Sequence, residues 1–264
     1  MPSPEPIYTS TNTTFAYQLR WAMTLFVDGQ LPPIESVSSV AEALETDGIR
    51  VLTRRYAEPN MLLLSLSTRP NLSPSTIVQR TKGRLWYLWK SLGEASVKKQ
   101  YALRSYGSQE REIVEAYVAG QAAHHPMATE RANELFDELQ FIDWAVQLEK
   151  PIEVGRSLVW FNLHIVLVHV ERWRTVRREL LLRVQKMVRS VCAKYGWRLS
   201  RCGIVADHLH IALGANVGDA VEDVVLRLMN NLAYVHGMKP VYQFSAYVGT
   251  FGEYDQRALR RAGE

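Results

Sequence analysis

Two pairs of residues in this chain have the types and spacing needed to act on a phosphate ester. His208 and His210 lie two positions apart in HLHIALG, a run typical of a β-strand, so both side chains leave the same face of a sheet. Two neutral imidazoles at this spacing suit one divalent cation. Tyr117 and Gln121 lie four positions apart in QEREIVEAYVAGQ, whose apolar spacing predicts a helix, so they share one helical face.

The two pairs complement each other chemically. A tyrosine hydroxyl ordinarily has a pKa near 10, so it attacks phosphorus poorly unless the phosphate is polarised and well placed. Mg²⁺ or Mn²⁺ held by His208 and His210 would do this, and Gln121 offers a third, neutral oxygen ligand. A structural explanation stays open for each pair, because chance HxH pairs are common and a helical tyrosine most often packs.

The elements expected to carry these residues occur twice in the same order. In the first copy we predict strands over 15–26, 49–56, 61–67 and 101–107, and helices over 33–46, 74–92 and 109–121. In the second copy we predict strands over 157–170, 197–205, 208–214 and 241–252, and helices over 175–196, 217–237 and from 254 onward. This return of strand, helix, strand, strand, helix, strand, helix indicates an internal duplication.

Short segments of the two copies also align. Residues 58–63 (EPNMLL) correspond to 207–212 (DHLHIA), and 101–107 (YALRSYG) correspond to 246–252 (AYVGTFG). Each copy follows the βαββαβ plan, so the predicted fold class is α+β, with two ferredoxin-like units in tandem. Because both helices of such a unit pack on one face of its sheet, the two histidines are expected on the open face.

The predicted units have clear limits. Residues 1–14 are rich in Pro, Ser and Thr and are expected to be disordered; 15–121 form the first unit and 157–264 the second. The joining segment 122–156 contains an acidic, helix-prone stretch with apolar residues at helical spacing, which predicts a bridging helix packed on one or both units. A flexible linker is the alternative.

Composition sets broad limits on function. The 264 residues carry a formal charge of +4 and a pI near 9.0, which permits a polyanionic partner without requiring one. The two cysteines, Cys192 and Cys202, lack any metal-site spacing and indicate a reducing compartment. No apolar run approaches the length of a membrane span and no signal-peptide pattern is present, so we expect a cytoplasmic protein without a membrane partner.

At these residues the chain resembles a known family. Asp207-His208-Leu209-His210, followed by small and apolar residues, resembles the HUH motif of the single-tyrosine transposases, which include the REP-associated tyrosine transposases. Residues 116–121 (AYVAGQ) resemble that family's nucleophile helix, and residues 73–83 resemble its helix after the HUH strand. The resemblance covers nearly the whole chain, once per copy. It implies that Tyr117 is the nucleophile and Gln121 a metal ligand.

The departures from the family pattern are complementary. The first copy keeps Tyr117 and Gln121 but has Pro-Asn-Met at its HUH position, whereas the second keeps both histidines but has Ala262 near the place of the tyrosine. The family resembles two-fold dimers whose tyrosine helix reaches the partner's histidines. The resemblance therefore implies a fused pseudo-dimer with one complete site, although the same residues would also fit a tyrosine acting within its own copy.

Basic residues suggest where DNA would bind. Arg80, Lys82 and Arg84 are interleaved with aromatic residues on the predicted helix 74–92, and Arg172 and Arg174 belong to an arginine cluster in the second copy. Solvated helix faces are the alternative for both groups. His124 and His125 are alternative metal ligands or a solvated pair, and His164 has no evident partner.

The function expected from these features is that of a transposase-like, metal-dependent single-strand DNA endonuclease and strand transferase. It would act through a 5′-phosphotyrosine intermediate, with Mg²⁺ or Mn²⁺ and no nucleotide cofactor. The family resemblance implies hairpin-containing element ends as its substrate. The first alternative is a catalytically decayed or domesticated DNA-hairpin-binding protein. The second is a ferredoxin-like interaction module that binds no nucleic acid.

Overall fold

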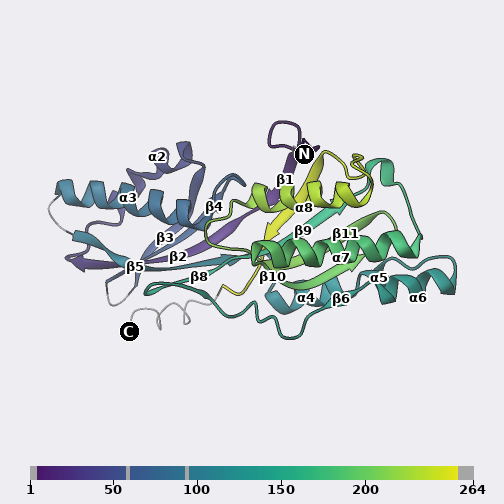
Figure 1. The fold of residues 1–264 in the computed structure, drawn as a ribbon. Helices are drawn as coiled ribbons and strands as arrows, with labels where there is room; N and C mark the ends of the chain where they lie inside the picture. The colour runs from purple at the N-terminus through teal and green to yellow at the C-terminus, as the bar shows by residue number, and fades with distance from the viewer. Residues whose placement is uncertain (1–4, 58–59, 93–94, 255–264) are drawn as a thin grey trace.

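The computed structural model describes residues 5–57, 60–92 and 95–254, which form two six-stranded sheets and their helices (Figure 1). The first sheet, sheet A, has the spatial order β1 (Thr14–Gln18), β12 (Ser245–Thr250), β9 (Asn162–Val168), β11 (His208–Gly214), β10 (Arg198–Ile204) and β6 (Phe141–Ile142). The second, sheet B, has the order β3 (Ile49–Ala57), β4 (Met61–Thr68), β2 (Arg20–Gly29), β5 (Ala95–Tyr106), β8 (Ser157–Trp160) and β7 (Ile152–Val154).

The helices lie between and beside these strands in the chain. They are α1 (Glu35–Ser38), α2 (Ala41–Thr46), α3 (Pro74–Leu92), α4 (Arg111–Ala119), α5 (Gln121–His124), α6 (Glu130–Glu138), α7 (Arg178–Tyr195) and α8 (Val221–Val235), with a 3₁₀ turn at Val170–Arg172. None of the helices in the described part of the chain has the length and apolar character of a membrane span. The predicted α+β class is confirmed.

The two sheets share one strand plan. We call the elements from β2 to α4 the first unit and those from β9 to β12 the second unit. The order β3-β4-β2-β5 in the first unit matches β10-β11-β9-β12 in the second, which is the order of a ferredoxin-like sheet. The β-bulge between Val51 and Thr53 in β3 also has its counterpart between Leu199 and Arg201 in β10. A shared bulge indicates duplication, because bulges are kept within related folds.

The strand register corrects the alignment of the two units by two residues. Arg20 and Asn162 begin the equivalent strands β2 and β9, and they pair with Ser67 of β4 and Gly214 of β11. Ser67 therefore corresponds to Gly214. Moving back by the same number of residues along β4 and β11, Met61 corresponds to His208 and Leu63 to His210. The sequence alignment had placed Met61 opposite His210; residues 58 and 59, which it also used, lie outside the described residues. An apolar cluster of Phe26, Met61, Ala102 and Trp160 occupies this place in the first unit, so no pair of imidazoles stands there.

The two units exchange their leading strands. β1 runs into β2, yet β1 pairs in parallel with β12 of the second unit. In the same way β8 runs into β9, yet β8 pairs in parallel with β5 of the first unit. The chain crosses between sheets at Leu19 and Phe161, both of which are fully buried. The prediction of one continuous strand at 15–26 and another at 157–170 was therefore wrong, because each run divides between two sheets.

Matching hydroxyls hold the two crossings. The backbone N–H of Arg20 donates to Thr250 Oγ1 at 2.8 Å, and that of Asn162 donates to Ser105 Oγ at 2.9 Å. Ser105 and Thr250 occupy equivalent positions in β5 and β12, since Trp21 pairs with Ser105 and Leu163 with Thr250. Both hydroxyls are buried, so each satisfies a backbone donor that water does not reach.

Two glycines let the units approach each other at these crossings. A Cβ on Gly107 would stand 2.3 Å from the carbonyl oxygen of Thr250, and one on Gly252 would stand 2.7 Å from that of Ser105. Both obstacles are backbone atoms, which cannot swing aside as a side chain can. Glycine is therefore required where the chain leaves β5 for α4, and this contact fixes α4 relative to the second unit.

Two segments outside the units are more ordered than predicted. Tyr8 is buried, its hydroxyl donates to the carbonyl oxygen of Tyr242 at 2.9 Å, and its backbone N–H donates to Asn230 Oδ1. This aromatic anchor explains why residues 5–14 do not match the expected disordered tail. The joining segment also packs, with Phe136 and Leu139 buried, so it is not a flexible linker. Its predicted helix is shorter than expected, because the chain turns into β6, which pairs with β10.

The central strand β9 shows how sheet A divides its two faces. Leu163, Ile165 and Leu167 are fully buried in the core beneath α7 and α8, whereas His164 and Val166 between them are only partly buried. Figure 1 shows α7 and α8 on one side of sheet A and α4 on the other. The second unit's open face is therefore covered by the first unit's last helix.

A half-buried histidine makes the stability of this fold sensitive to acid. Burial, followed by the charges of His169 and Arg183, lowers the pKa of His236 to about 4. As the pH falls below 6.5, this residue takes up a proton in the unfolded chain but not in the folded chain. The free energy of unfolding is therefore highest above pH 6.5 and decreases as the pH falls toward about 4. We expect His236→Gln to reduce the change in the free energy of unfolding between pH 7, 6 and 5, measured by urea unfolding. The same change in the variant as in the wild-type protein would contradict the role of His236.

Candidate active site

Helix α4 docks on the open face of the second unit. Its apolar side chains Val114 and Val118 pack with Ala212 of β11 and with Phe251, and all four are buried. Because valines four residues apart lie on one side of a helix, the opposite side of α4 stays free to carry other groups. The packing of α4 on β10 and β11 therefore brings a helix of the first unit to the strands of the second (Figure 1).

A buried charge network fixes the helix on the sheet. Glu115 of α4 is buried, accepts a hydrogen bond from Ser200 Oγ, and accepts another from the Arg111 guanidinium at 2.6 Å. Arg201 Nη1 lies 4.0 Å from the same carboxylate. Ser200 and Arg201 lie at the β10 bulge, where the register shift brings neighbouring residues toward one face. The bulge that both units share thus serves to hold α4 in the second unit.

Removal of this carboxylate should loosen the helix. We expect Glu115→Ala to lower the free energy of unfolding by about 3 kcal/mol, because it removes the buried carboxylate that accepts from both Ser200 and Arg111. The measurement is equilibrium unfolding in urea. Glu112→Ala is the matched control, since Glu112 also pairs with Arg111 but its side chain is 80% exposed, and it should change stability by less than about 0.5 kcal/mol. Equal effects of the two variants would contradict the role of Glu115.

The two histidines of β11 lie side by side on this face. Their ring centroids are 5.1 Å apart, and both side chains are more than 90% buried. His208 Nδ1 lies 2.7 Å from Asp207 Oδ1, and His210 Nδ1 lies 3.0 Å from His164 Nε2. Each ring is therefore oriented through Nδ1, which leaves Nε2 of both rings available to a ligand. A partner on the far nitrogen is the usual support of a metal-binding histidine.

His164 was not assigned a partner from the sequence, yet it stacks on His210 with a centroid distance of 5.2 Å. It pairs with Ala212, two residues from His210 on the neighbouring strand, so its side chain leaves the same face. Burial lowers the pKa of His164 to about 4; burial, followed by the adjacent imidazoles, lowers that of His210 to about 2. Both rings are therefore neutral at pH 7, the form that binds a metal ion.

Tyr117 stands at the edge of this histidine group. Its ring centroid lies 5.4 Å from that of His210 and 6.1 Å from that of His164, edge-on in both cases. The side chain is 41% exposed, so it is accessible from solvent. The structure thus brings the tyrosine of the first unit to the histidines of the second.

Gln121 lies beneath Tyr117, after a break in the helix at Gly120. Its Nε2 donates to the carbonyl oxygen of Tyr117 at 2.9 Å, and its Oε1 is buried with no hydrogen-bond partner among the described residues. Gly203 makes room for it, because a Cβ there would stand 2.7 Å from Gln121 Cγ. Gly203 pairs directly with His210, so Gln121 fills the space beside that histidine.

These donors fit a divalent cation. Two imidazoles and an amide oxygen, completed by water, form a ligand set that a divalent metal ion can accept. The orphaned Oε1 of Gln121 is the telling observation, since a buried acceptor without a donor costs free energy unless a ligand satisfies it. His208, His210 and Gln121 are therefore the residues that would hold the ion.

The other two histidines lie at the rim. The ring of His125 is 4.8 Å from that of His208, and the ring of His124 is 5.4 Å from that of Tyr117. Burial, and then the neighbouring His208, lowers the pKa of His125. Across the described ranges, three or more His, Cys, Asp or Glu side chains nowhere converge on one metal position, so these histidines do not complete an all-imidazole site.

The predicted DNA-binding residues divide into two groups. Arg172 lies 3.5 Å from Asp207, and the charge of Arg174 also acts on that carboxylate, so both are close to His208. Arg80, Lys82 and Arg84 lie on α3, which Figure 1 places over sheet B, at the other end of the molecule from α5. Arg80 and Arg84 bind Asp47, and Lys82 donates to the carbonyl oxygen of Lys99. These three residues therefore lie over the other sheet, away from Tyr117, and their binding to DNA stays a prediction.

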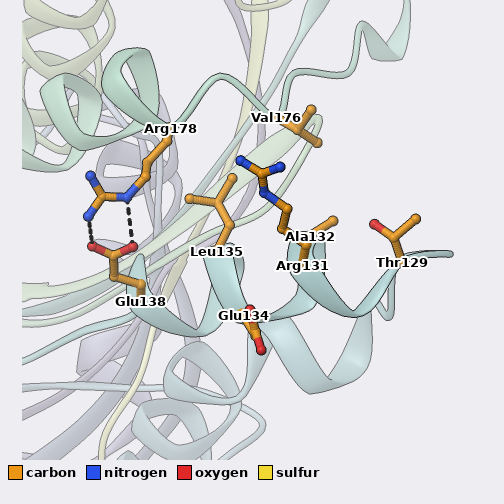
Figure 2. A pocket seen from close by; sticks show the side chains of 8 residues that line it. All are labelled: Thr129, Arg131, Ala132, Glu134, Leu135, Glu138, Val176 and Arg178. Atoms are coloured by element: carbon orange, nitrogen blue, oxygen red, sulfur yellow. Dashed lines mark hydrogen bonds and ion pairs between the residues drawn. The ribbon is translucent and has the colours of Figure 1, made fainter.

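Two cavities differ in their relation to this site. A cavity of about 540 Å³ lies between α6 and the segment before α7, with the Arg178–Glu138 ion pair at one end (Figure 2). Its lining includes no candidate site residue. A second cavity, of about 380 Å³, is lined by Tyr117 and His164 together with residues of β12. The second cavity is therefore the one adjoining the candidate chemistry.

Comparison with known proteins supports the resemblance in the second unit. Residues 158–239 match the model of the family described as "Transposase IS200 like". This match confirms the resemblance to these transposases over that segment, which contains both histidines. No curated protein matches the chain.

Solved structures add two similar chains. One is a candidate transposase from Deinococcus radiodurans R1, 19% identical, with a TM-score of 0.35, covering 42% of this chain and 94% of that one. The other is a REP-associated tyrosine transposase bound to a REP hairpin, 11% identical, with a TM-score of 0.30, covering 38% of this chain and 59% of that one.

Proposed function

We propose, from the similarity of residues 158–239 to IS200-like transposases and from the site described above, that the chain cleaves and rejoins single-stranded DNA. The observation that carries this proposal is the position of Tyr117, whose ring from the first unit lies edge-on to His210 of the second at 5.4 Å. An exposed tyrosine beside two oriented imidazoles has the parts of a phosphoryl-transfer site.

The proposed reaction exchanges one phosphoester for another. Tyr117 Oη attacks the scissile phosphorus, the phenolic proton leaves, and the new bond is a 5′-phosphotyrosine. The P–O3′ bond breaks, and the departing oxygen takes up a proton to give a free 3′-hydroxyl. Reversal by another 3′-hydroxyl rejoins the strand, so no nucleotide cofactor is consumed.

The remaining residues would bind and orient. His208, His210 and Gln121 would hold Mg²⁺ or Mn²⁺. When bound, that ion would draw charge from the non-bridging oxygens of the phosphate and steer the leaving 3′-oxygen. Asp207 and His164 would fix the two imidazoles through their Nδ1 atoms.

Basic residues beside the site suit a DNA backbone. Arg172 and the neighbouring Glu171 both have left-handed backbone conformations, with φ of 54° and 52°, so this turn carries strain of the kind found at functional loops. An open groove of about 880 Å³ continues from the turn and includes Trp173, Arg177 and Lys239. Cations and an exposed indole provide phosphate contacts and a stacking surface.

The test is formation of a covalent protein–DNA adduct. Full-length protein is mixed with single-stranded hairpin oligonucleotides and Mn²⁺ or Mg²⁺, and the products are separated on a denaturing gel. We expect an adduct with either ion and none with EDTA. Salt-dependent binding without an adduct would replace this proposal with a DNA-hairpin-binding protein that has lost its chemistry. Absence of binding as well would favour an interaction module.

A further inference from the structure

The cavity beside Tyr117 has the size and walls of a small-molecule site. Its volume of about 380 Å³ falls in the range of pockets that enclose small organic ligands. Four parts of the chain that are distant in sequence form it: Gln18 from β1, the segment from Ser108 through α4, His164 from β9, and β12 with Phe251 after it. It therefore exists only because the units exchange strands and α4 crosses to the second unit.

Aromatic rings line its mouth. Tyr117 and Tyr247 are 41% and 40% exposed, which leaves both ring faces partly open to solvent. His164 lies between them, with its ring edge-on to each at centroid distances of 6.1 and 6.0 Å. Exposed tyrosines in a groove are the usual surfaces on which unpaired bases stack.

Amide groups supply polar contacts at the same cavity. The side chains of Gln18 and Gln109 line it, and neither makes a side-chain hydrogen bond to another described residue. A glutamine amide carries both donors and an acceptor, and it can pair with the N6 and N7 positions of adenine through two hydrogen bonds. These amides therefore suit the polar edge of a base whose face lies on a tyrosine.

Different side chains occupy the equivalent place in the first unit. The strand registers equate Gly249 with Arg104, Tyr247 with Ala102 and His164 with Ala22. The Arg104 guanidinium lies 4.4 Å from the centroid of the Trp160 ring and so fills that position. A Cβ on Gly249 would instead stand 2.8 Å from the Tyr247 hydroxyl, so glycine lets the tyrosine lie across the strand. The glycine and the tyrosine that shape this cavity therefore belong to the copy that keeps the histidines.

We propose that this cavity binds one unpaired nucleobase of the DNA strand, adjacent to the phosphate that Tyr117 attacks, with adenine favoured. The inference rests on the proposed function for the identity of the strand. Because Tyr117 lines the cavity and also faces His210, a base held against Tyr247 sets which phosphate reaches the tyrosine. The cavity would then select the cleavage position.

Direct binding of nucleotides tests this independently of catalysis. The four deoxynucleoside 5′-monophosphates are titrated into the full-length protein and followed by ligand-observed NMR. We expect deoxyadenosine monophosphate to bind best, Tyr247→Ala to weaken it at least about tenfold, and Gln109→Ala to reduce the preference for adenine. Tyr17→Ala is the matched control, since Tyr17 is an exposed tyrosine of the adjoining strand that does not line the cavity. It should leave binding unchanged.

A competition arm identifies the source of the base. A single-stranded hairpin oligonucleotide should displace the mononucleotide, whereas an oligonucleotide that keeps its backbone but has abasic sites in the single-stranded part should displace it poorly. Failure of the intact strand to displace it would overturn the proposal in favour of a free-nucleotide site. Equal binding by the wild-type protein and Tyr247→Ala, or no binding of any mononucleotide, would also overturn it. A covalent adduct without nucleotide binding would support the proposed function and contradict the nucleobase site. Nucleotide binding without an adduct would support the nucleobase site and contradict the proposed cleavage reaction.

Discussion

Substitution of Tyr117 by phenylalanine is expected to reduce covalent adduct formation at least about a thousandfold, to background. The change removes one oxygen atom, the only group through which this residue can join phosphorus. The ring contacts with His210 and His164 use ring atoms and should remain. The measurement is the rate of adduct formation on a denaturing gel with Mn²⁺.

The control must separate chemistry from binding. Tyr117→Phe should bind single-stranded hairpin DNA within about twofold of the wild-type protein, because phosphate contacts and not this hydroxyl supply most of the affinity. Tyr17→Phe is the matched variant, since it removes the hydroxyl of a similarly exposed tyrosine that does not line the cavity, and it should still form the adduct. An adduct that persists in Tyr117→Phe would assign the nucleophile to another residue.

The second large effect concerns the histidine pair. We expect His210→Ala to weaken Mn²⁺ binding at least about a hundredfold and to abolish the adduct, because it removes a ligand and also the partner of His164. Titration with Mn²⁺ followed by electron paramagnetic resonance measures the ion directly, without relying on activity.

A remote histidine provides the comparison. His236 lies after α8 and lines the groove bounded by Trp173 and Lys239, outside the proposed ligand set. His236→Ala should therefore bind Mn²⁺ like the wild-type protein. Retention of Mn²⁺ by His210→Ala would show that the ion binds elsewhere and would contradict the proposed ligands.

Local periodicity was enough to predict the faces of the site. The two-residue repeat of a strand placed His208 and His210 on one side, and their rings do lie 5.1 Å apart. The four-residue spacing of Tyr117 and Gln121 predicted a shared helical face. The helix breaks at Gly120, yet the amide of Gln121 still reaches the carbonyl oxygen of Tyr117. Their roles in chemistry stay predictions.

Features that depend on pairing between distant segments could not be predicted. His164 contacts His210 because of the register in which β9 and β11 pair. That register cannot be predicted from the sequence of either strand alone. The sequence of residues 14–29 does not show that they divide into β1 and β2. The residue pattern of a β-strand is the same whichever sheet the strand joins. The packing of Tyr8 against Tyr242 likewise joins residues more than 230 positions apart.

The exchange of leading strands has a consequence for how the molecule opens. Unfolding of either unit alone would strip a strand from the other, since β1 completes one edge of sheet A and β8 pairs with β5 in sheet B. The two halves should therefore behave as one cooperative foldon, with amides of β9 and β2 exchanging hydrogen only through global opening. The residues around Tyr117, drawn from both halves, would then remain assembled for as long as the chain is folded, at any dilution.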